Sequence, residues 1–373
     1  MLNRLLNERN FPPILKMNDG TPADAASWEA RRQELLHALS THSYGFTPPA
    51  PRRVWGEIES DSSSSRVYGG KIRLQKIRIC FETDHGVCTF PVFLFIPTRV
   101  ERPPVFLHIA FRFYMPPGEA PIAYVPVEEI IDSGYALASV CYLDMVNDKY
   151  FGDYTDGIAA HFGTTIERQP DEWGKIGMWA YGASRFLDYL LTREDLDASH
   201  TAVVGHSRLG KTALWCGAQD ERFFLTISNN SGYGGAATSR RGKGERVRDF
   251  LRAGSWDWFC ENFKLYTDEK VDEKPYDQSF LLALVAPRYL YVGSAKEDRG
   301  ADPHSEFLTA LRASDAWELH GKPGLITPDR LPEPGELLHD GCIGYHVRTG
   351  DHFFSREDWQ NYIRFMNLKM QER

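Results

Sequence analysis

The sequence lacks the features that would point to a membrane or a nucleic acid. No apolar run approaches the length of a membrane span, and the opening MLNRLLNERNFPPILKMND has no apolar core of a signal peptide. The formal charge is −8 at pH 7 with acidic and basic residues interspersed, so no basic face attracts nucleic acid or an anionic membrane. We therefore expect a cytoplasmic protein that binds neither nucleic acid nor a membrane.

Paired cysteines and metal-ligand spacings are also missing. The six cysteines lie in apolar segments and no two form a C-x-x-C pair, which favours buried free thiols over disulfides or a metal site. His346 and His352 match no common ligand spacing, and neither a cysteine nor an acidic pair accompanies them. We expect no metal and no cofactor.

What the chain does contain is enough apolar material for a large core. Its 373 residues are 42% hydrophobic and 13% aromatic. Residues 1–53 form a polar lead-in with one predicted helix, ASWEARRQELLHALS, which we interpret as a packing arm. Residues 54–109 hold β-branched and aromatic runs that predict consecutive strands: KIRLQKIRICFE, VCTFPVFLFIP and PPVFLHIAF.

Beyond Tyr124, predicted strands and helices alternate. Strand patterns (YALASVCYLDM, TAVVGH, FFLTISNN, RYLYVGS) are separated by helical ones such as IGMWAYGASRFLDYLLTR and LGKTALWCGAQ, and this alternation predicts an α/β fold with a mostly parallel sheet. Residues 232–275 interrupt the alternation, and such an insertion usually lies over the carboxyl ends of the strands, where ligands bind. LHDGCIGYHVRTGDH is predicted as a loop before a closing helix from Arg356. Because no linker or repeat divides the chain, we predict a single domain over residues 1–373.

The stretch AVVGHSRLGKTALW, residues 202–215, fits two motifs. Residues 205–212 match G-x-x-x-x-G-K-[ST], the phosphate-binding loop of P-loop NTPases, while a strand, Gly-His-Ser-Arg and a helix match a nucleophile elbow that presents Ser207. A P-loop NTPase also needs a carboxylate that ends an apolar strand and holds magnesium. Asp298 follows its predicted strand only after several polar residues. A P-loop NTPase is therefore kept as a remote alternative.

The nucleophile elbow requires an acid after a later strand and a histidine near the C-terminus. Asp298 follows RYLYVGS, and His352 lies in GYHVRTGDH before the last predicted helix. A neutral imidazole activates serine by taking its proton, and a carboxylate orients the imidazole. The general G-x-S-x-G pattern is not fully met, because Leu209 stands where a small residue is expected and Gly210 comes one later. We therefore expect the tight turn around Ser207 to be accommodated in a different way from that of the general pattern.

GHSRLGK resembles the G-C-S-R-x-G signature of the glucuronoyl esterases, carbohydrate esterase family fifteen, and in particular of its bacterial members. The likeness continues in order through SNNSGYGGAATSRRGKGE, WDWFCENFKLY, YDQSFLLALVAPRYLYV, SAKEDRGADPHSEFL and GYHVRTGDH, over roughly residues 100–360. The resemblance implies an α/β-hydrolase, a three-layer sandwich with a mostly parallel central sheet and a lid-like insertion.

The resemblance also implies roles for individual residues around the elbow. Ser207 would be the nucleophile, and Arg208 would support the oxyanion beside the backbone N–H of the residue after the nucleophile. Lys211 lies one helical turn after Ser207 on the same face, and it matches a lysine that contacts sugar hydroxyls. Glu245 and Trp258 match a sugar-contacting glutamate and tryptophan. The simpler alternatives are a surface salt bridge for Arg208, a solvated Lys211 and a core Trp258.

The acid needs separate treatment, because fungal members carry a glutamate where this chain has Asn230. Asp298 fits an aspartate that many bacterial members carry after the next strand. Glu297 and Asp302 are adjacent alternatives, and Asp302 before a proline is better interpreted as a helix cap.

The resemblance favours His352 as the base, since the family histidine is the last one before the closing helix, and we interpret His346 as structural. Two positions depart from the family, Gly300 in place of tryptophan and Ser279 in place of histidine. Both are expected near the substrate, so the pocket should be wider or less selective.

These observations predict a serine carboxylic ester hydrolase that acts on carbohydrate esters without a cofactor. Ser207 would attack the ester carbonyl, His352 would move the proton, Asp298 would orient His352, and Arg208 would hold the oxyanion. The resemblance implies a (4-O-methyl)glucuronoyl acyl group and a lignin-like alcohol, so the partner is a small carbohydrate ester or oligosaccharide. The alternatives are an acetyl-sugar or acetylxylan esterase with the same triad and a catalytically silent carbohydrate-binding relative.

Overall fold

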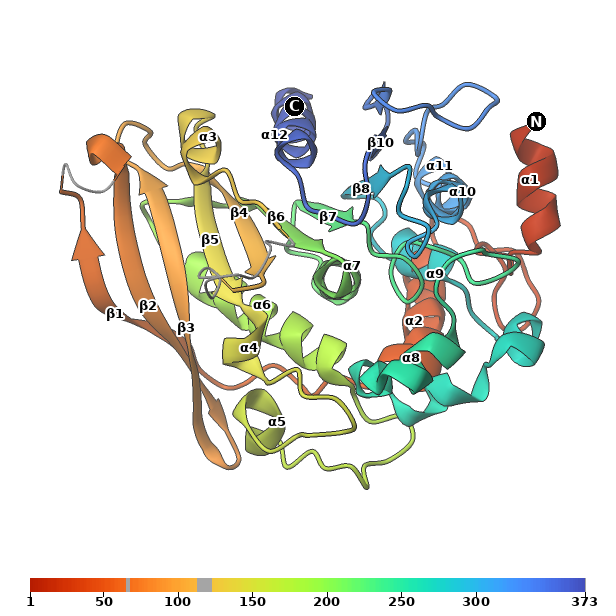
Figure 1. Cartoon of the computed structure of the whole chain (residues 1–373), viewed down its shortest axis with the longest axis horizontal. Helices are drawn as coiled ribbons and strands as arrows, with labels where there is room; N and C mark the ends of the chain where they lie inside the picture. Colours follow the sequence, from red (N-terminus) through yellow and green to blue (C-terminus); the bar gives the residue numbers. More distant parts are fainter. Residues whose placement is uncertain (65–67, 113–122, 373) are drawn as a thin grey trace.

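A ten-stranded sheet crosses the molecule in the order β1-β2-β3-β5-β4-β6-β7-β8-β10-β9 (Figure 1). The computed structural model describes residues 1–64, 68–112 and 123–372. The strands are β1 (Val54–Ser62), β2 (Ile72–Thr83), β3 (Gly86–Pro97), β4 (Pro104–Ala110), β5 (Ala136–Cys141), β6 (Asp197–His206), β7 (Leu225–Asn229), β8 (Tyr289–Ala295), β9 (Leu337–Leu338) and β10 (Ile343–Arg348).

The sheet is antiparallel at its edges and parallel in its middle. β1, β2 and β3 pair antiparallel, as do β3 with β5 and β10 with β9, whereas β5, β4, β6, β7, β8 and β10 are parallel neighbours. All residues of β4 after its first and all of β7 are buried, as expected for parallel strands that are covered on both faces. The predicted α/β class with a mostly parallel sheet is confirmed.

Helices cover both faces of the sheet and make three layers. α3 (Val127–Asp132) and α12 (Arg356–Gln371) pack on one face, and α6 (Lys175–Leu190) and α7 (Arg208–Gln219) pack on the other. Figure 1 shows α3 and α12 along the upper side of the sheet and α6 and α7 below it. Among the described residues, no helix is both long and apolar enough to cross a bilayer.

The remaining helices surround these layers. They are α1 (Leu2–Arg9), α2 (Trp28–Leu39), α4 (Tyr142–Met145), α5 (Gly157–His161), α8 (Val247–Ala253), α9 (Gln278–Ala283), α10 (Pro303–Ala313) and α11 (Asp315–Glu318). The N-terminal segment packs through α1 on α10 and through α2 on α9. Tyr44, at the end of this segment, is fully buried, stacks on Trp215 with ring centroids 4.4 Å apart and donates to the Gly234 carbonyl at 3.0 Å. The segment thus supports both α7 and the insertion.

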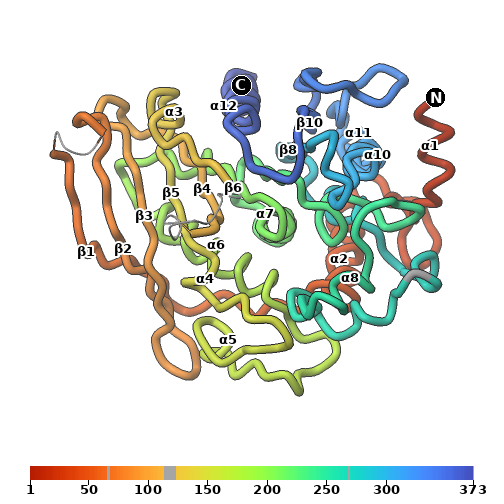
Figure 2. The backbone as a smooth tube through the Cα atoms, viewed as in Figure 1, coloured from red at the N-terminus to blue at the C-terminus, as the bar shows by residue number. Residues whose placement is uncertain are grey.

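The insertion of residues 232–275 leaves the sheet after β7 and returns before α9. It contains α8 and three short 3-10 helices, Ser255–Trp258, Glu261–Leu265 and Asp268–Glu273. Lys175 of α6 and Asp257 of the insertion form a fully buried ion pair of 2.8 Å that ties the two together. Figure 2 traces this green-to-teal segment on the side of the molecule away from β1, β2 and β3.

Three elements differ from those predicted. Ile343–Arg348 forms β10 where a loop was predicted, because the buried polar residues His346 and Arg348 interrupt the apolar pattern by which strands are recognised. The predicted strand YALASVCYLDM ends at Cys141 and continues as α4. The polar lead-in holds a second helix, α1. All six cysteines are free; five of them are buried and Cys141 is half-buried.

Candidate active site

Ser207 occupies a sharp turn between β6 and α7. Its backbone has φ 58° and ψ −126°, a left-handed conformation that non-glycine residues rarely adopt. The Ser207 N–H donates to the Asn229 carbonyl at 2.9 Å, which fixes the turn against β7. A strained residue held in this way at a helix N-terminus is typical of functional sites.

Two glycines make the turn possible, and their positions explain why Leu209 is tolerated. A Cβ on Gly205 would lie 2.1 Å from the Leu209 carbonyl oxygen, so no other residue fits there. A Cβ on Gly210 would lie 3.0 Å from the Ser231 Cβ and 3.1 Å from the Asn229 carbonyl oxygen. The close approach to the next strand therefore occurs at Gly210, while the Leu209 side chain is fully buried.

Asp298 and His352 meet at the same edge of the sheet. Asp298 follows β8 and accepts a hydrogen bond at 2.6 Å from Nδ1 of His352, in the loop after β10. The Asp298 carboxylate also accepts from Asn230 Nδ2 at 2.8 Å and from the Ala301 N–H at 3.1 Å. Burial opposes ionisation of Asp298, but its hydrogen bonds and the His352 charge hold its pKa below the ordinary value.

His352 lies beside the residue that precedes Ser207. The rings of His352 and His206 have centroids 4.6 Å apart, and the His352 side chain is 42% exposed. In Figure 2 the blue loop between β10 and α12 lies on the side of α7 that faces α12. With Nδ1 of His352 bonded to Asp298, the other ring nitrogen is left for a proton from a nearby hydroxyl. The structure thus gathers Ser207, His352 and Asp298 at one edge of the sheet.

His206 itself is a buried neutral histidine. Its Nδ1 donates to the side-chain oxygen Oδ1 of Asn229 at 2.7 Å, and Nδ2 of the same side chain donates to the Tyr362 hydroxyl at 2.8 Å. Burial, followed by the neighbouring His352 charge, lowers the pKa of His206 to about 3. His206 therefore contacts His352 without adding a second positive charge.

The loop that carries His352 is fixed by Arg348. Its guanidinium donates to Asp358 Oδ2 at 3.0 Å, to the Thr349 carbonyl at 2.9 Å and to the Asp351 and Phe353 carbonyls. Three of these contacts are with carbonyls of the loop residues on either side of His352, and the fourth joins the loop to Asp358 in α12. The exposed loop that carries the base is therefore held in place at several points.

His346 lies away from this loop surface. It is 1% exposed, bonds to Asp358 at 2.8 Å through Nε2 and to the Tyr291 hydroxyl at 3.1 Å through Nδ1. Both ring nitrogens therefore have buried partners, consistent with the structural role assigned to His346.

Arg208 begins α7 and faces a buried carboxylate. Arg208 Nη1 donates to Asp148, and its guanidinium lies 4.5 Å from the Trp258 ring centroid and 5.8 Å from that of Phe111. Asp148 also accepts from Trp258 Nε1 at 2.7 Å and from the Tyr142 hydroxyl at 3.1 Å. Trp258 is 6% exposed, so its indole N–H and one ring face serve Asp148 and Arg208.

Lys211 and Glu245 form a pair between α7 and the insertion. The Lys211 side chain is 3% exposed, and its Nζ donates to the Ser231 carbonyl at 2.6 Å and to Glu245 Oε2 at 3.3 Å. The Glu245 side chain is 41% exposed. Lys211 is therefore not a solvated helix lysine, and its engaged ammonium is unlike the free lysine that a phosphate-binding loop requires.

The neighbouring acids have other contacts. Glu297 accepts from the Gly350 N–H, and Asp302 caps α10 by accepting from the Ser305 N–H at 3.2 Å. Gly300 accepts from the Glu245 N–H at 2.9 Å, and Ser279 is fully buried in α9. Within the described residues, no group of three or more histidine, cysteine, aspartate or glutamate side chains could hold a metal ion.

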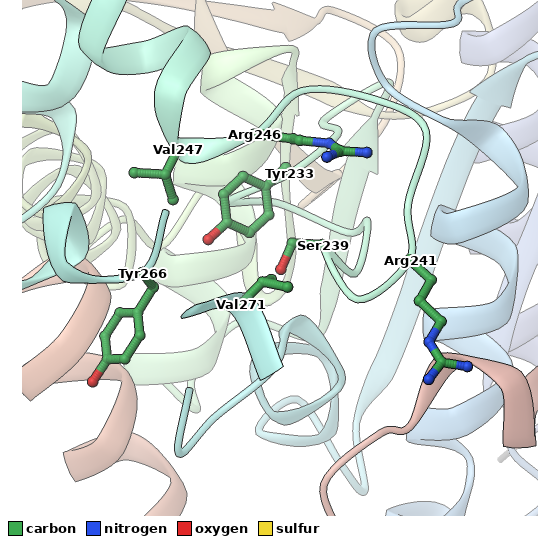
Figure 3. A pocket seen from close by; sticks show the side chains of 7 residues that line it. All are labelled: Tyr233, Ser239, Arg241, Arg246, Val247, Tyr266 and Val271. Atoms are coloured by element: carbon green, nitrogen blue, oxygen red, sulfur yellow. The ribbon is translucent and has the colours of Figure 1, made fainter. Parts of the chain in front are cut away.

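A separate cavity of about 170 Å³ lies within the insertion. It is lined by Tyr233, Ser239, Arg241, Arg246, Val247, Tyr266 and Val271, none of which is a candidate catalytic residue. Figure 3 shows Tyr233, Ser239 and Val271 close together and Arg241 pointing away from them.

Sequence reasoning missed four residues that contact the candidate catalytic groups or their loops: Asp148, His206, Glu306 and Arg348. Glu306 is fully buried, accepts from the Gly232 N–H at 2.9 Å and bonds to Ser294 Oγ at 2.6 Å. No spacing rule reveals such partners: the contacts of Asp148 and Glu306 join segments apart in the chain, and those of Arg348 depend on how the loop after β10 folds back. For Glu306 and Arg348, the signal in the sequence is a charged residue inside an otherwise apolar helix or strand.

The comparisons with known proteins agree with one another. A family model described as "Glucuronyl esterase, fungi" matches residues 157–321. The carbohydrate esterase MZ0003 of an unknown prokaryotic organism is 35% identical, over 96% of this chain and 89% of that protein. The 4-O-methyl-glucuronoyl methylesterase of Schizophyllum commune is 30% identical, over 75% of this chain and 66% of the fungal protein. The solved glucuronoyl esterase of Solibacter usitatus superposes with a TM-score of 0.86 and 36% identity, over 96% of this chain and 97% of that one.

Proposed function

The chain belongs to the glucuronoyl esterases of carbohydrate esterase family fifteen and is a carboxylic ester hydrolase, and from that premise we propose how its residues act. The substrate is an ester of glucuronic or 4-O-methylglucuronic acid, with Ser207, His352 and Asp298 as the catalytic triad. The Asp298–His352 hydrogen bond of 2.6 Å, formed beside the residue before Ser207, is the observation that carries the proposal.

The first half of the reaction forms an acyl-enzyme. His352 Nε2 takes the Ser207 proton as Oγ attacks the ester carbonyl, and Asp298 stabilises the imidazolium through Nδ1. The oxyanion is held by the first-turn N–H groups of α7, which have no acceptor within the helix, and by Arg208. The tetrahedral intermediate collapses as His352 returns the proton to the leaving alcohol oxygen.

The second half repeats the same steps with water. His352 removes a proton from a water molecule, whose oxygen attacks the acyl carbon, and the Ser207–acyl bond breaks as His352 protonates Oγ. The products are the alcohol and a uronic acid that ionises at neutral pH. Lys211 and Glu245 bind the sugar hydroxyls of the acyl group, supported by their pairing at the start of α7. Trp258 contacts the sugar through the small part of its surface, 6%, that remains exposed.

The experiment compares hydrolysis of benzyl glucuronate by the wild-type protein, the Ser207→Ala variant and a matched Ser199→Ala variant. Ser199 is exposed at the far end of β6 and bonds to Asp197, so its loss should leave the rate unchanged. Ser207→Ala should lower kcat by at least about 10⁴-fold, since the nucleophile is absent.

p-Nitrophenyl acetate serves as the competing substrate. Serine-dependent turnover that favours the glucuronate ester supports the proposal. Turnover of acetate alone would keep the triad and reject the uronate substrate, and equal rates for wild type and Ser207→Ala would reject the triad.

A further inference from the structure

The carboxylate of Asp148 is buried directly against the arginine beside the nucleophile. The Asp148 side chain is 4% exposed and the Arg208 side chain 23% exposed. We propose that Asp148 is a positioning residue that orients Arg208 and balances its charge, so that the site releases the anionic acid product. This inference rests on the proposed function, because it concerns the acid that ester hydrolysis generates.

The orientation follows from how the pair is held. Trp258 Nε1 and the Tyr142 hydroxyl both donate to Asp148, so the carboxylate itself cannot swing away. Arg208 Nη1 donates to this fixed acceptor while the guanidinium lies over the Trp258 ring. Because a guanidinium is a rigid planar fork, fixing one nitrogen and one face determines where its other N–H groups point.

One N–H group of the Arg208 guanidinium has no hydrogen-bond partner among the described residues. Arg208 Nε is buried and has no hydrogen-bond partner. A buried, unpaired donor is costly, so Arg208 is held in this position by its other contacts. The Arg208 side chain therefore has a defined direction, set by Asp148 at Nη1 and by the Trp258 ring.

The charge balance matters because the substrate and the product differ in charge. The reacting carboxyl is neutral in the ester and negative in the acid that remains after hydrolysis. A buried guanidinium without a counter-ion would attract this carboxylate strongly in a poorly solvated site. Tight binding of the product slows turnover and contributes nothing to the chemical step.

Directed donors can still distinguish the transition state. Net positive charge attracts the planar product carboxylate and the tetrahedral oxyanion alike, whereas N–H groups of fixed direction favour the position that the oxyanion occupies. Asp148 thus neutralises the net positive charge of Arg208, which would attract product and oxyanion alike, and keeps its N–H groups pointed toward the oxyanion position.

The test uses Asp148→Asn, which preserves the shape and removes the charge; it keeps one of the two acceptor oxygens, so either Trp258 Nε1 or the Arg208 and Tyr142 donors lose an acceptor. Asp153→Asn is the matched control, because Asp153 lies on the same loop and pairs with Lys149 and Thr155 instead of Arg208. The measurements are kcat and KM for benzyl glucuronate, and the inhibition constants of free glucuronate and of uncharged glucuronamide.

We expect Asp148→Asn to tighten inhibition by glucuronate about tenfold, equivalent to ~1.4 kcal/mol, and to leave inhibition by glucuronamide within about threefold of wild type. Product release should then limit kcat, visible as a burst of alcohol release. Asp153→Asn should behave as wild type on both inhibitors. An unchanged ratio of the two inhibition constants in Asp148→Asn would overturn the charge-balance role.

The wild-type protein provides a second test that needs no variant. With Arg208 balanced, glucuronate should inhibit no more than about threefold more strongly than glucuronamide, and a preference of tenfold or more for the anion would refute the inference even if Asp148→Asn fails to fold. Failure of the proposed function has a different signature, since the wild-type protein would then hydrolyse no uronate ester.

Discussion

Replacing Asp298 with asparagine should disable the base, and the structure indicates why an isosteric amide is a poor substitute. The Asp298 carboxylate accepts three hydrogen bonds: His352 and Asn230 donate to Oδ2, and the Ala301 N–H donates to Oδ1. An amide has one oxygen and one nitrogen, so it cannot accept at both positions. Either Ala301 faces an amide N–H, or His352 does.

Both arrangements are unfavourable. With the oxygen toward His352, the amide N–H₂ and the Ala301 N–H are two donors in contact, and one buried donor is unsatisfied at a cost of about 1–3 kcal/mol. With the nitrogen toward His352, the ring must accept at Nδ1 and carry its proton on Nε2, where it cannot take the proton of Ser207. The imidazolium also loses its counter-charge. We expect kcat to fall by about 10³- to 10⁴-fold.

The assay is steady-state hydrolysis of benzyl glucuronate by Asp298→Asn, with Glu297→Gln as the matched control. Glu297 precedes Asp298, and its side chain accepts from the Gly350 N–H, which a glutamine oxygen can also do, so Glu297→Gln should stay within about threefold of wild type. Activity of Asp298→Asn within threefold of wild type, or a larger loss in Glu297→Gln, would refute the assignment of the acid.

Two further predictions concern buried ionisable groups. Burial raises the pKa of Glu306 from 4.5 to about 8, so its stabilising contribution is complete below pH 4.5 and is lost as the pH rises to about 8. Glu306→Gln, fixed in the neutral state, should lose less stability than wild type between these limits, by at least ~1 kcal/mol in urea unfolding; parallel losses would contradict this. Lys211→Met should raise KM for benzyl glucuronate about tenfold and leave the p-nitrophenyl acetate rate within threefold, because the proposed role of Lys211 is to bind the sugar, and its protein partners, Glu245 and the Ser231 carbonyl, do not act on the ester. Equal losses on both substrates would make Lys211 structural.

The sequence predicts best where local pattern and chain order suffice. The alternation of strands and helices after Tyr124 predicts the parallel sheet. The chain order of Ser207, Asp298 and His352 places each of them after a strand, and these strands all end at the same edge of the sheet. The structure brings the last two into hydrogen-bond contact. Motif order works here because successive parallel strands deliver their following residues to one edge of the sheet.

Long-range pairs are where prediction from the sequence stops. β10 was read as a loop because His346 and Arg348 are polar, yet both are buried and meet Asp358 in α12. Burial of His346 and Arg348 is favourable only when Asp358 pairs with them. The residues next to them in the sequence do not indicate this pairing. The contact between Asp148 and Arg208 is likewise not predicted from the sequence, because the two residues lie 60 positions apart.

The contacts of Arg348, which the sequence does not predict, and the Ser207 turn, which it does, together position the nucleophile and the base. Ser207 lies in a strained turn, and its position is set by β6, β7 and α7, most of whose residues are buried. His352 is on an exposed loop and has no such scaffold, so Arg348 and Asp358 must supply one through contacts on either side of it. A nucleophile and base must meet within hydrogen-bond reach for proton transfer, and an error of about 1 Å can cost 10²-fold in rate. The distance between the nucleophile and the base therefore depends on the Arg348–Asp358 contact as well as on the Ser207 turn.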